Sequence, residues 1–149
     1  MTPALELAFT VTVLLGDVID VGRTAYGHRR VIPITGGTVA GPALSGRVLP
    51  AGADYQVIRP DGTTELEARY VLETGAGLVY VDNRGFRTAS PDDVERLTRG
   101  EPVDPSRVYF RTTPRFETAV PELAWLQSTV FVALAVRHPD SVELSVYSA

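Results

Sequence analysis

The chain has 149 residues, of which 44% are hydrophobic and 21% charged, and its net charge is −4. These values are ordinary for a globular protein, and the length suits one domain spanning residues 1–149. The lack of cysteine excludes disulfides and thiolate nucleophiles, and because all 14 basic residues are arginine, a lysine Schiff base is excluded as well.

The first half of the chain reads as short strands separated by turns. Apolar residues alternate with polar ones over residues 5–14, which predicts a half-buried strand. Residues 16–27 are too irregular to assign, and a short apolar run follows at 31–34. Further strands are predicted near residues 44–49, 53–59, 64–73 and 77–82. Asn83-Arg84-Gly85 is a strong turn signal after the last of these.

The second half contains the one predicted helix. Ser90 is a good N-cap and Pro91 suits the first helical position, so a helix is expected over residues 91–98. Gly100 and Pro102 would end it. Strands are predicted again near residues 107–113, 115–119, 128–137 and 141–147. The turn His138-Pro139-Asp140 joins the final pair.

Many short strands, frequent turns and one short helix indicate an all-β fold, either an antiparallel closed β-barrel or a sandwich. We favour the barrel, because closure removes exposed sheet edges. The strand at 128–137 is apolar on both faces, unlike a strand with one solvated face. Its outer face must be covered by a helix or loop, or by another subunit. The latter predicts a homodimer or a higher homo-oligomer.

Several ordered segments carry a resemblance to a known family. They are GGTVAGPALSGRVLPAGADYQVIRPDGTTELEARYVLET, GLVYVDNRG and VYFRTTPRFET, followed by AWL. With them the chain resembles the domain of unknown function 3237 family over nearly its whole length. Tyr55 stands where that family often has Trp. The resemblance implies a small β-barrel of the lipocalin-like or allene-oxide-cyclase-like kind, and implies little about a reaction.

Carboxylates in apolar surroundings are the first candidates for acid–base catalysis, because burial raises a carboxyl pKa. Asp54 lies in GADYQV and Glu117 in RFETAV, so both are candidates. A structural salt bridge from either one to Arg69 or Arg111 is the alternative. Tyr80 is the third catalytic candidate, as a phenol that could take part in proton transfer.

Aromatic and arginine side chains are the candidates for binding a substrate. Rings with polar tips suit a cavity for an oxygenated ligand, although core packing would explain them equally. Arginines could bind a carboxylate or a carbonyl oxygen. The expected substrate-binding residues are Tyr26, Tyr55, Arg69, Tyr109, Arg111 and Trp125. Two distant histidines and no cysteine predict no metal site.

These patterns favour a small-molecule-binding barrel that acts as a cofactor-independent acid/base enzyme. The expected reaction is a cyclisation, isomerisation or elimination on an apolar oxygenated metabolite. A non-catalytic carrier or sensor is the alternative, and a purely structural domain without a cavity is a third. No apolar run is long enough to span a membrane, and the chain lacks basic clusters. We therefore expect a cytoplasmic protein without cofactor, nucleic-acid or membrane partners.

Overall fold

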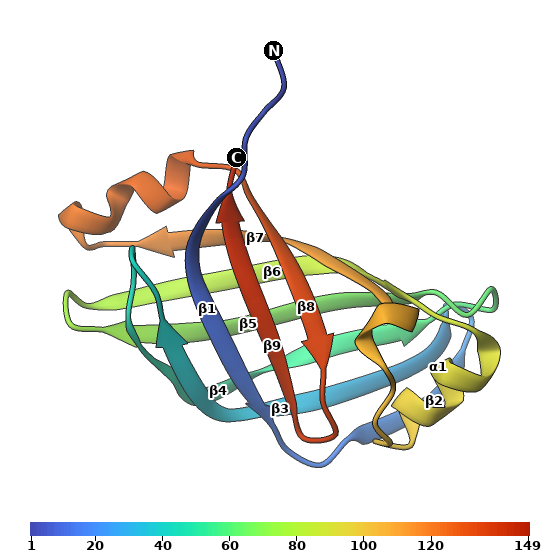
Figure 1. Ribbon diagram of the computed structural model, residues 1–149. Helices are drawn as coiled ribbons and strands as arrows, with labels where there is room; N and C mark the ends of the chain where they lie inside the picture. The colour runs from blue at the N-terminus through green and yellow to red at the C-terminus, as the bar shows by residue number, and fades with distance from the viewer.

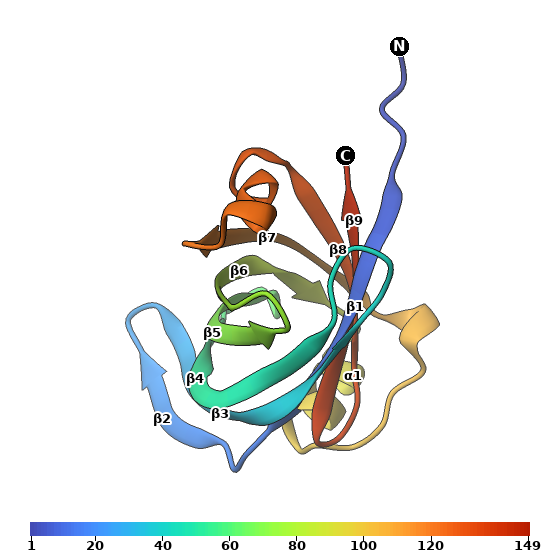
Figure 2. The same cartoon turned by 90° about the vertical axis from the view of Figure 1, so that its left-hand side faces the viewer.

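Alternating strands close on themselves to form an antiparallel β-barrel, as the sequence predicted (Figures 1 and 2). The computed structural model describes all residues, 1–149. The strands are β1 (Glu6–Leu15), β2 (Ile19–Thr24), β3 (Gly27–Ala40), β4 (Gly46–Ile58), β5 (Thr64–Thr74), β6 (Leu78–Thr88), β7 (Tyr109–Thr118), β8 (Phe131–Arg137) and β9 (Ser141–Ser148). Their order in the nine-stranded sheet is β1-β9-β8-β7-β6-β5-β4-β3-β2.

Pairing of β1 with β3 closes the barrel and leaves β2 outside as a hairpin partner of β3. Eight of the nine strands therefore form the wall. The closure depends on Gly37, which lies opposite Val13 and has a φ of +140°. A Cβ atom at this position would collide with the carbonyl oxygen of Thr12. Glycine is required here both for the backbone conformation and for the close approach of the two strands.

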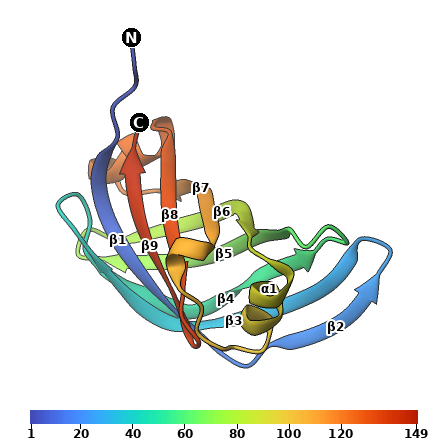
Figure 3. The ribbon, with the colours of Figure 1, turned by 45° about the vertical axis from the view of Figure 1, so that its right-hand side comes forward.

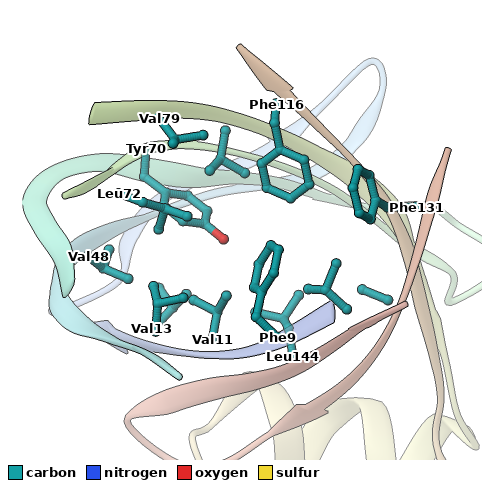
Figure 4. Close-up of a cluster of buried hydrophobic side chains, with 14 of the residues drawn as sticks. Phe9, Val11, Val13, Val48, Tyr70, Leu72, Val79, Phe116, Phe131 and Leu144 are labelled. Carbon is teal, nitrogen blue, oxygen red and sulfur yellow. The ribbon is translucent and has the colours of Figure 1, made fainter. Parts of the chain in front are cut away.

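One half of the barrel interior is apolar and tightly packed (Figure 4). Phe116 lies edge-on to both Phe9 and Phe131, with ring centroids 5.6 and 5.0 Å away. Leu72 and Val79 are fully buried beside them. The Tyr70 hydroxyl points into the middle of the barrel from the same region (Figure 4). Burial of this cluster supplies the hydrophobic driving force for closing the sheet.

Short helices flank the barrel at its two ends. The helix α1 (Pro91–Thr98) and the 3-10 helix η1 (Pro105–Arg107) lie together at one end (Figures 1 and 3). The Ser90 hydroxyl accepts a hydrogen bond from the Asp93 backbone N–H, so the predicted N-cap and helix are confirmed. The 3-10 helix η2 (Pro121–Ser128), which the sequence did not suggest, lies beside β7 at the other end.

The wall is weakest between β7 and β8, where only Arg111 and Thr112 of β7 have partners on β8. Beyond Thr112, β7 pairs on one side only, and η2 fills the gap with the buried side chains of Leu123 and Leu126. This one-sided pairing explains how Pro114, which has no N–H, fits inside β7. The predicted break between residues 113 and 115 is therefore wrong.

Two other predicted boundaries also differ from the structure. The segments near 44–49 and 53–59 form the single strand β4, whose pairing is only interrupted between Val48 and Gly52. The predicted turn at Asn83-Arg84-Gly85 is wrong, because β6 continues through it to Thr88. Asn83 is buried there and pairs with Ala68, which shows that tertiary pairing overrides the local turn preference.

The outer face of β8 is covered unevenly. Near its end, Val136 borders Val103 and Pro105 of the segment between α1 and β7. Farther back, Leu134 on the strand and Val130 just before it are 38% and 68% exposed.

No helix in the structure has both the length and the apolar character needed to cross a membrane.

Candidate functional site

Strand alternation divides the polar residues between the interior and the outer face of the barrel. On β4, Asp54 and Gln56 point inward and are only 6% and 1% exposed, whereas Tyr55 between them points outward. The same rule places Asn83 and Arg87 of β6 inside. These inward-pointing side chains make part of the barrel interior polar.

We call this region the interior polar cluster. Its members come from β3, β4, β6, β7 and β8, and they are Arg30, Asp54, Gln56, Asn83, Arg87, Thr112 and Arg137. All are buried except Arg137, which is half-buried at the rim. The cluster lies next to the apolar core, since Tyr70 and Phe110 border both regions.

Hydrogen bonds connect three members of the cluster to α1. The Gln56 side-chain amide donates to Asp54 Oδ2 over 2.8 Å, and Gln56 Oε1 accepts from Arg30 Nη1 over 3.4 Å. Arg30 Nη2 also donates to the Thr98 carbonyl oxygen at the end of α1, over 3.1 Å. Helix C-termini favour cations, so this contact stabilises both the arginine and the position of the helix.

Arg87 is a deeply buried cation in the protein's interior. It is 3% exposed, and its guanidinium lies 5.5 Å from the centre of the Phe110 ring. Burial lowers the pKa of Arg87 to about 10, with Asp54 acting in the opposite direction. None of the protein's ion pairs includes Arg30, Arg87 or Arg137. The guanidinium groups and Asp54 therefore share one enclosed region without direct pairing.

Four buried polar atoms in the cluster have no hydrogen-bond partner within the protein. They are Asp54 Oδ1, Asn83 Oδ1, Thr112 Oγ1 and Arg87 Nη1. Asp54, Asn83 and Thr112 line one cavity of about 30 Å³, together with Tyr70. A cavity of this size holds about two water molecules. Buried polar atoms without protein partners are rare, so this cavity is a place for water or for the polar group of a ligand.

Burial also controls the proton affinity of the acidic groups in the cluster. It raises the pKa of Asp54 above the ordinary value of an aspartate, although the Gln56 hydrogen bond and the charges of Arg87 and Arg137 oppose it. The pKa of Tyr70 is raised by burial and then by the charge of Asp54. Tyr70 therefore keeps its proton at neutral pH, and Asp54 holds a proton more tightly than an ordinary aspartate does.

The structure places only one of the three predicted catalytic residues inside the barrel. Asp54 lies in the interior polar cluster, whereas Glu117 and Tyr80 face each other across β7 and β6 on the outer face. Of the predicted binding residues, Arg69 also faces outward and lies 4.9 Å from the centre of the Tyr55 ring. The possible salt bridges from Asp54 or Glu117 to Arg69 or Arg111 do not form.

An outer groove of about 680 Å³ runs over the outer face of β3 to β8 and brings three predicted residues together. Tyr55, Tyr109 and Arg111 line it, and Arg111 lies 5.3 Å from the centre of the Tyr109 ring. The rest of its lining includes Arg29, Glu65, Glu67, Arg84 and Phe86. The groove is open, and one of its arginines, Arg84, forms a 3.3 Å ion pair with Glu67.

The two remaining predicted residues lie away from both regions. Tyr26 is 78% exposed in the turn between β2 and β3. Trp125 belongs to η2, and its ring centroid is 6.0 Å from that of Phe131, so it packs over the apolar end. The predicted residues therefore do not converge on one cavity.

Sequence reasoning missed most of the interior polar cluster, although a signal for part of it was present. Gln56 is two residues from Asp54, so on a strand the two must share a face. Asn83 and Arg87 follow Val79 and Val81 at the same spacing of two, but the false turn at Asn83-Arg84-Gly85 concealed this alternation. Nothing local indicates that Arg30, Thr112 and Arg137 would join them.

The structure contains no group of three or more His, Cys, Asp or Glu side chains arranged to hold a metal ion. His28 is bound to Asp20 on the outer hairpin, with Nε2 2.7 Å from Oδ1. His138 lies 3.6 Å from Glu143 in the last hairpin.

Comparisons with known proteins place the chain among relatives without an assigned activity. A UPF0311 protein of Bradyrhizobium diazoefficiens is 50% identical over 150 residues, covering 99% of this chain and 98% of that protein. The crystal structure of a conserved protein of unknown function from Rhodopseudomonas palustris has a TM-score of 0.91 and 50% identity, with 99% of each chain covered.

A more distant structure is that of an enzyme from Penicillium herquei, with a TM-score of 0.71 and 19% identity over 98% of this chain and 96% of that one. At this identity the likeness concerns the fold alone. The family model described as "Protein of unknown function (DUF3237)" matches residues 3–149. The chain therefore belongs to this family.

Proposed function

We propose that the protein binds a small oxygenated metabolite at the interior polar cluster and acts on it by acid–base catalysis, with Asp54 as the proton-transferring group. One observation carries the proposal. Asp54 Oδ1 and Arg87 Nη1 are both buried and without partners in the same region, and no ion pair joins the two residues. A carboxylate and a guanidinium that do not neutralise each other leave a site for a substrate that contacts both.

The chemistry that fits this pair is proton removal next to a carbonyl group. The Asp54 carboxylate would take the proton, and the electrons of the C–H bond would form a C=C bond. The carbonyl π electrons would move to the oxygen, giving an enolate. Arg87 and Arg30 would stabilise the developing negative charge in buried surroundings, where charges interact more strongly than in bulk water. If the substrate has a C=C bond between its β and γ carbons, return of the proton to the γ carbon completes an isomerisation. If it has a leaving group on the β carbon, the enolate electrons form a C=C bond as that group departs with its bonding pair, which completes an elimination.

The raised pKa of Asp54 supports this role. A carboxyl group with an ordinary pKa is a weak base near neutral pH, and a raised pKa increases its basicity. The cavity of about 30 Å³ admits only the reacting end of a substrate, so a larger metabolite requires the barrel end near α1 to open. The enzyme from Penicillium herquei shares the fold, but the proposal rests on the residues of this chain.

Exchange of carbon-bound protons tests the proposal without knowledge of the natural substrate. Hydroxyacetone and pyruvate in D₂O would be followed by proton NMR with and without the protein. We expect exchange above the buffer rate for the wild type, and a loss of about 100-fold or more in Asp54→Asn, as for removal of a general base. Glu117→Gln is the matched control, because Glu117 lies on the outer face. Equal losses in both variants, or no loss in Asp54→Asn, would contradict the proposal.

The carrier or sensor hypothesis makes a different prediction for the same experiment. The same polar cluster can hold a ligand without reacting with it. Binding of hydroxyacetone or pyruvate that depends on Arg87, with no exchange above the buffer rate, would favour a carrier over an enzyme. Absence of both binding and exchange would contradict both assignments of the cluster.

A further inference from the structure

The interior polar cluster has more positive than negative charge. Arg30, Arg87 and Arg137 supply guanidinium groups, and Asp54 is the one acidic member. Two of these cations are also influenced from the rim, Arg30 by Asp20 and Arg137 by Asp140. Arg87 is influenced by no carboxylate except Asp54. A buried excess of positive charge is costly without a counterion, and the least compensated charge is that of Arg87.

The unpartnered atoms define where a counterion would bind. Arg87 Nη1 is a donor, and the Thr112 hydroxyl can donate as well. Both belong to the same end of the barrel, because Gly85 pairs with Thr112 and Arg87 pairs with Phe110 on the neighbouring strand. Thr112 and Phe110 line the cavity of about 30 Å³, and the Arg87 guanidinium lies over the Phe110 ring. The cavity offers the space of about two water molecules, which is close to that of the two oxygens of a carboxylate.

We propose that the ligand of the interior polar cluster is an anion whose carboxylate or enolate oxygens bind between Arg87 and Thr112. This inference rests on the proposed function, because it takes the cluster as the ligand site. A guanidinium binds carboxylate oxygens through charge-assisted hydrogen bonds. In the outer groove, Arg84 is already paired with Glu67. Arg111 there lies against the Tyr109 ring and donates to the Phe110 carbonyl oxygen.

The position of Asp54 adds a requirement that a merely structural cluster would not have. Its carboxylate repels a bound anion, so removal of its charge should strengthen anion binding while abolishing proton transfer. The two activities of the site should therefore respond to Asp54→Asn in opposite directions.

Acetate and its neutral analogue acetamide are suitable probes, because each has four non-hydrogen atoms and neither needs to react. Binding would be measured by calorimetry and by NMR titration at constant ionic strength. We expect acetate to bind at least about tenfold more tightly than acetamide, as for a charge-assisted hydrogen bond. Arg87→Gln should remove this preference, and Arg111→Gln on the outer face should keep it.

Asp54→Asn keeps the inference testable if Arg87→Gln does not fold. We expect acetate to bind several-fold more tightly to Asp54→Asn than to the wild type. Equal affinity for acetate and acetamide would overturn the inference, as would weaker acetate binding in a folded Asp54→Asn protein. Acetate binding without exchange of the carbon-bound protons of hydroxyacetone or pyruvate would contradict only the proposed catalysis. Exchange of the carbon-bound protons of neutral hydroxyacetone, without acetate binding, would contradict only this inference.

Discussion

Asp54 combines two properties that rarely occur together in a small β-barrel: it is almost fully buried, and one of its oxygens has no partner. Burial of an ionised carboxylate costs free energy unless charges or hydrogen bonds compensate it. Gln56 donates to one oxygen, the arginines act from a distance, and the Glu67 backbone has a smaller effect in the same direction. The proposed function rests on these two features of Asp54, its burial and its unpartnered oxygen.

The raised pKa of Asp54 predicts a specific dependence of stability on pH. The folded protein holds this proton to a higher pH than the unfolded chain, so the stability contributed by the protonated form is lost as the pH rises through the folded pKa. Asp93 acts in the opposite direction. Burial opposes its ionisation, but hydrogen bonds from Arg107, Ser90 and Arg96 lower its pKa, and its contribution is lost as the pH falls.

Comparison with Asp54→Asn isolates the contribution of Asp54. Urea unfolding of both proteins from about pH 4 to about pH 8 spans the range above an ordinary aspartate pKa. The wild type should become progressively less stable relative to Asp54→Asn as the pH rises. The prediction is wrong if the difference in the free energy of unfolding does not change with pH, or if the wild type becomes more stable than the variant as the pH rises. Either result would show that the ionised carboxylate is stabilised by its arginine neighbours.

Side-chain direction was the part of the site that the sequence could not supply. Asp54 was identified by its apolar surroundings, yet Arg69, which pairs opposite the neighbouring Ala53, points to the other side of the wall. A shift of one residue in register exchanges the two faces of a strand. The local sequence does not state which register the barrel adopts, so the partners of Asp54 could not be chosen from it.

At the level of elements, the helix α1 agrees with its predicted bounds because its signals are local. The N-cap, the proline and the acidic first turn all lie within five residues of its start. Strand ends depend instead on neighbours that are distant in the sequence. This explains why the sequence predicts two strands each where the structure has β4 and β7, and why it predicts an end of β6 before Thr88.

The helix α1 should contribute to stability through Leu97, which is 3% exposed and borders Val103 and Ala135 beneath the helix. Leu97→Ala should lower the free energy of unfolding by about 2–4 kcal/mol, through lost burial and the cavity left behind. Val94, which lines an open surface pocket beside α1, provides a control, and Val94→Ala should cost less. Equal losses in urea unfolding would show that α1 is not anchored by Leu97.

Barrel closure should depend on Gly37 more than on an ordinary turn glycine. Gly37→Ala adds a collision with the Thr12 carbonyl oxygen to the strain of a positive φ. The free energy of unfolding should therefore fall by more than the roughly 1–3 kcal/mol expected from backbone strain alone. Gly62→Ala is the matched control, because Gly62 has a φ of +87° and nothing near the added Cβ. Equal losses in the free energy of unfolding for the two variants would show that β1 and β3 can move apart at Gly37 without loss of stability.

On the scale of the whole molecule, the closed antiparallel barrel was predictable from the number of short alternating strands. Division of its interior into an apolar half and a polar half was not, because it depends on which side chains each strand directs inward. The apolar residues fill one end, and the hydrogen bond from Arg30 to Thr98 joins the polar end to α1.

Association of several copies remains a prediction from the two-faced strand β8. Part of its outer face is covered within the chain near Val136, but Val130, Leu134, Phe86 and Tyr109 are exposed. We expect a homodimer or higher homo-oligomer in sedimentation velocity at tens of micromolar protein, about the concentration at which micromolar contacts persist. Leu134→Asp should shift it to monomers. If the wild type is a monomer, these exposed apolar residues belong to the ordinary surface and not to an interface.

The central claim is that ligands bind inside the barrel and not in the outer groove. NMR titration of protein labelled with ¹⁵N in arginine and glutamine side chains distinguishes the two sites in one experiment. With hydroxyacetone as the probe, we predict shifts of the Arg87 Nε–H and Gln56 amide resonances, with Arg84 and Arg111 unchanged. Shifts confined to Arg84 and Arg111, which line the outer groove, would contradict the account.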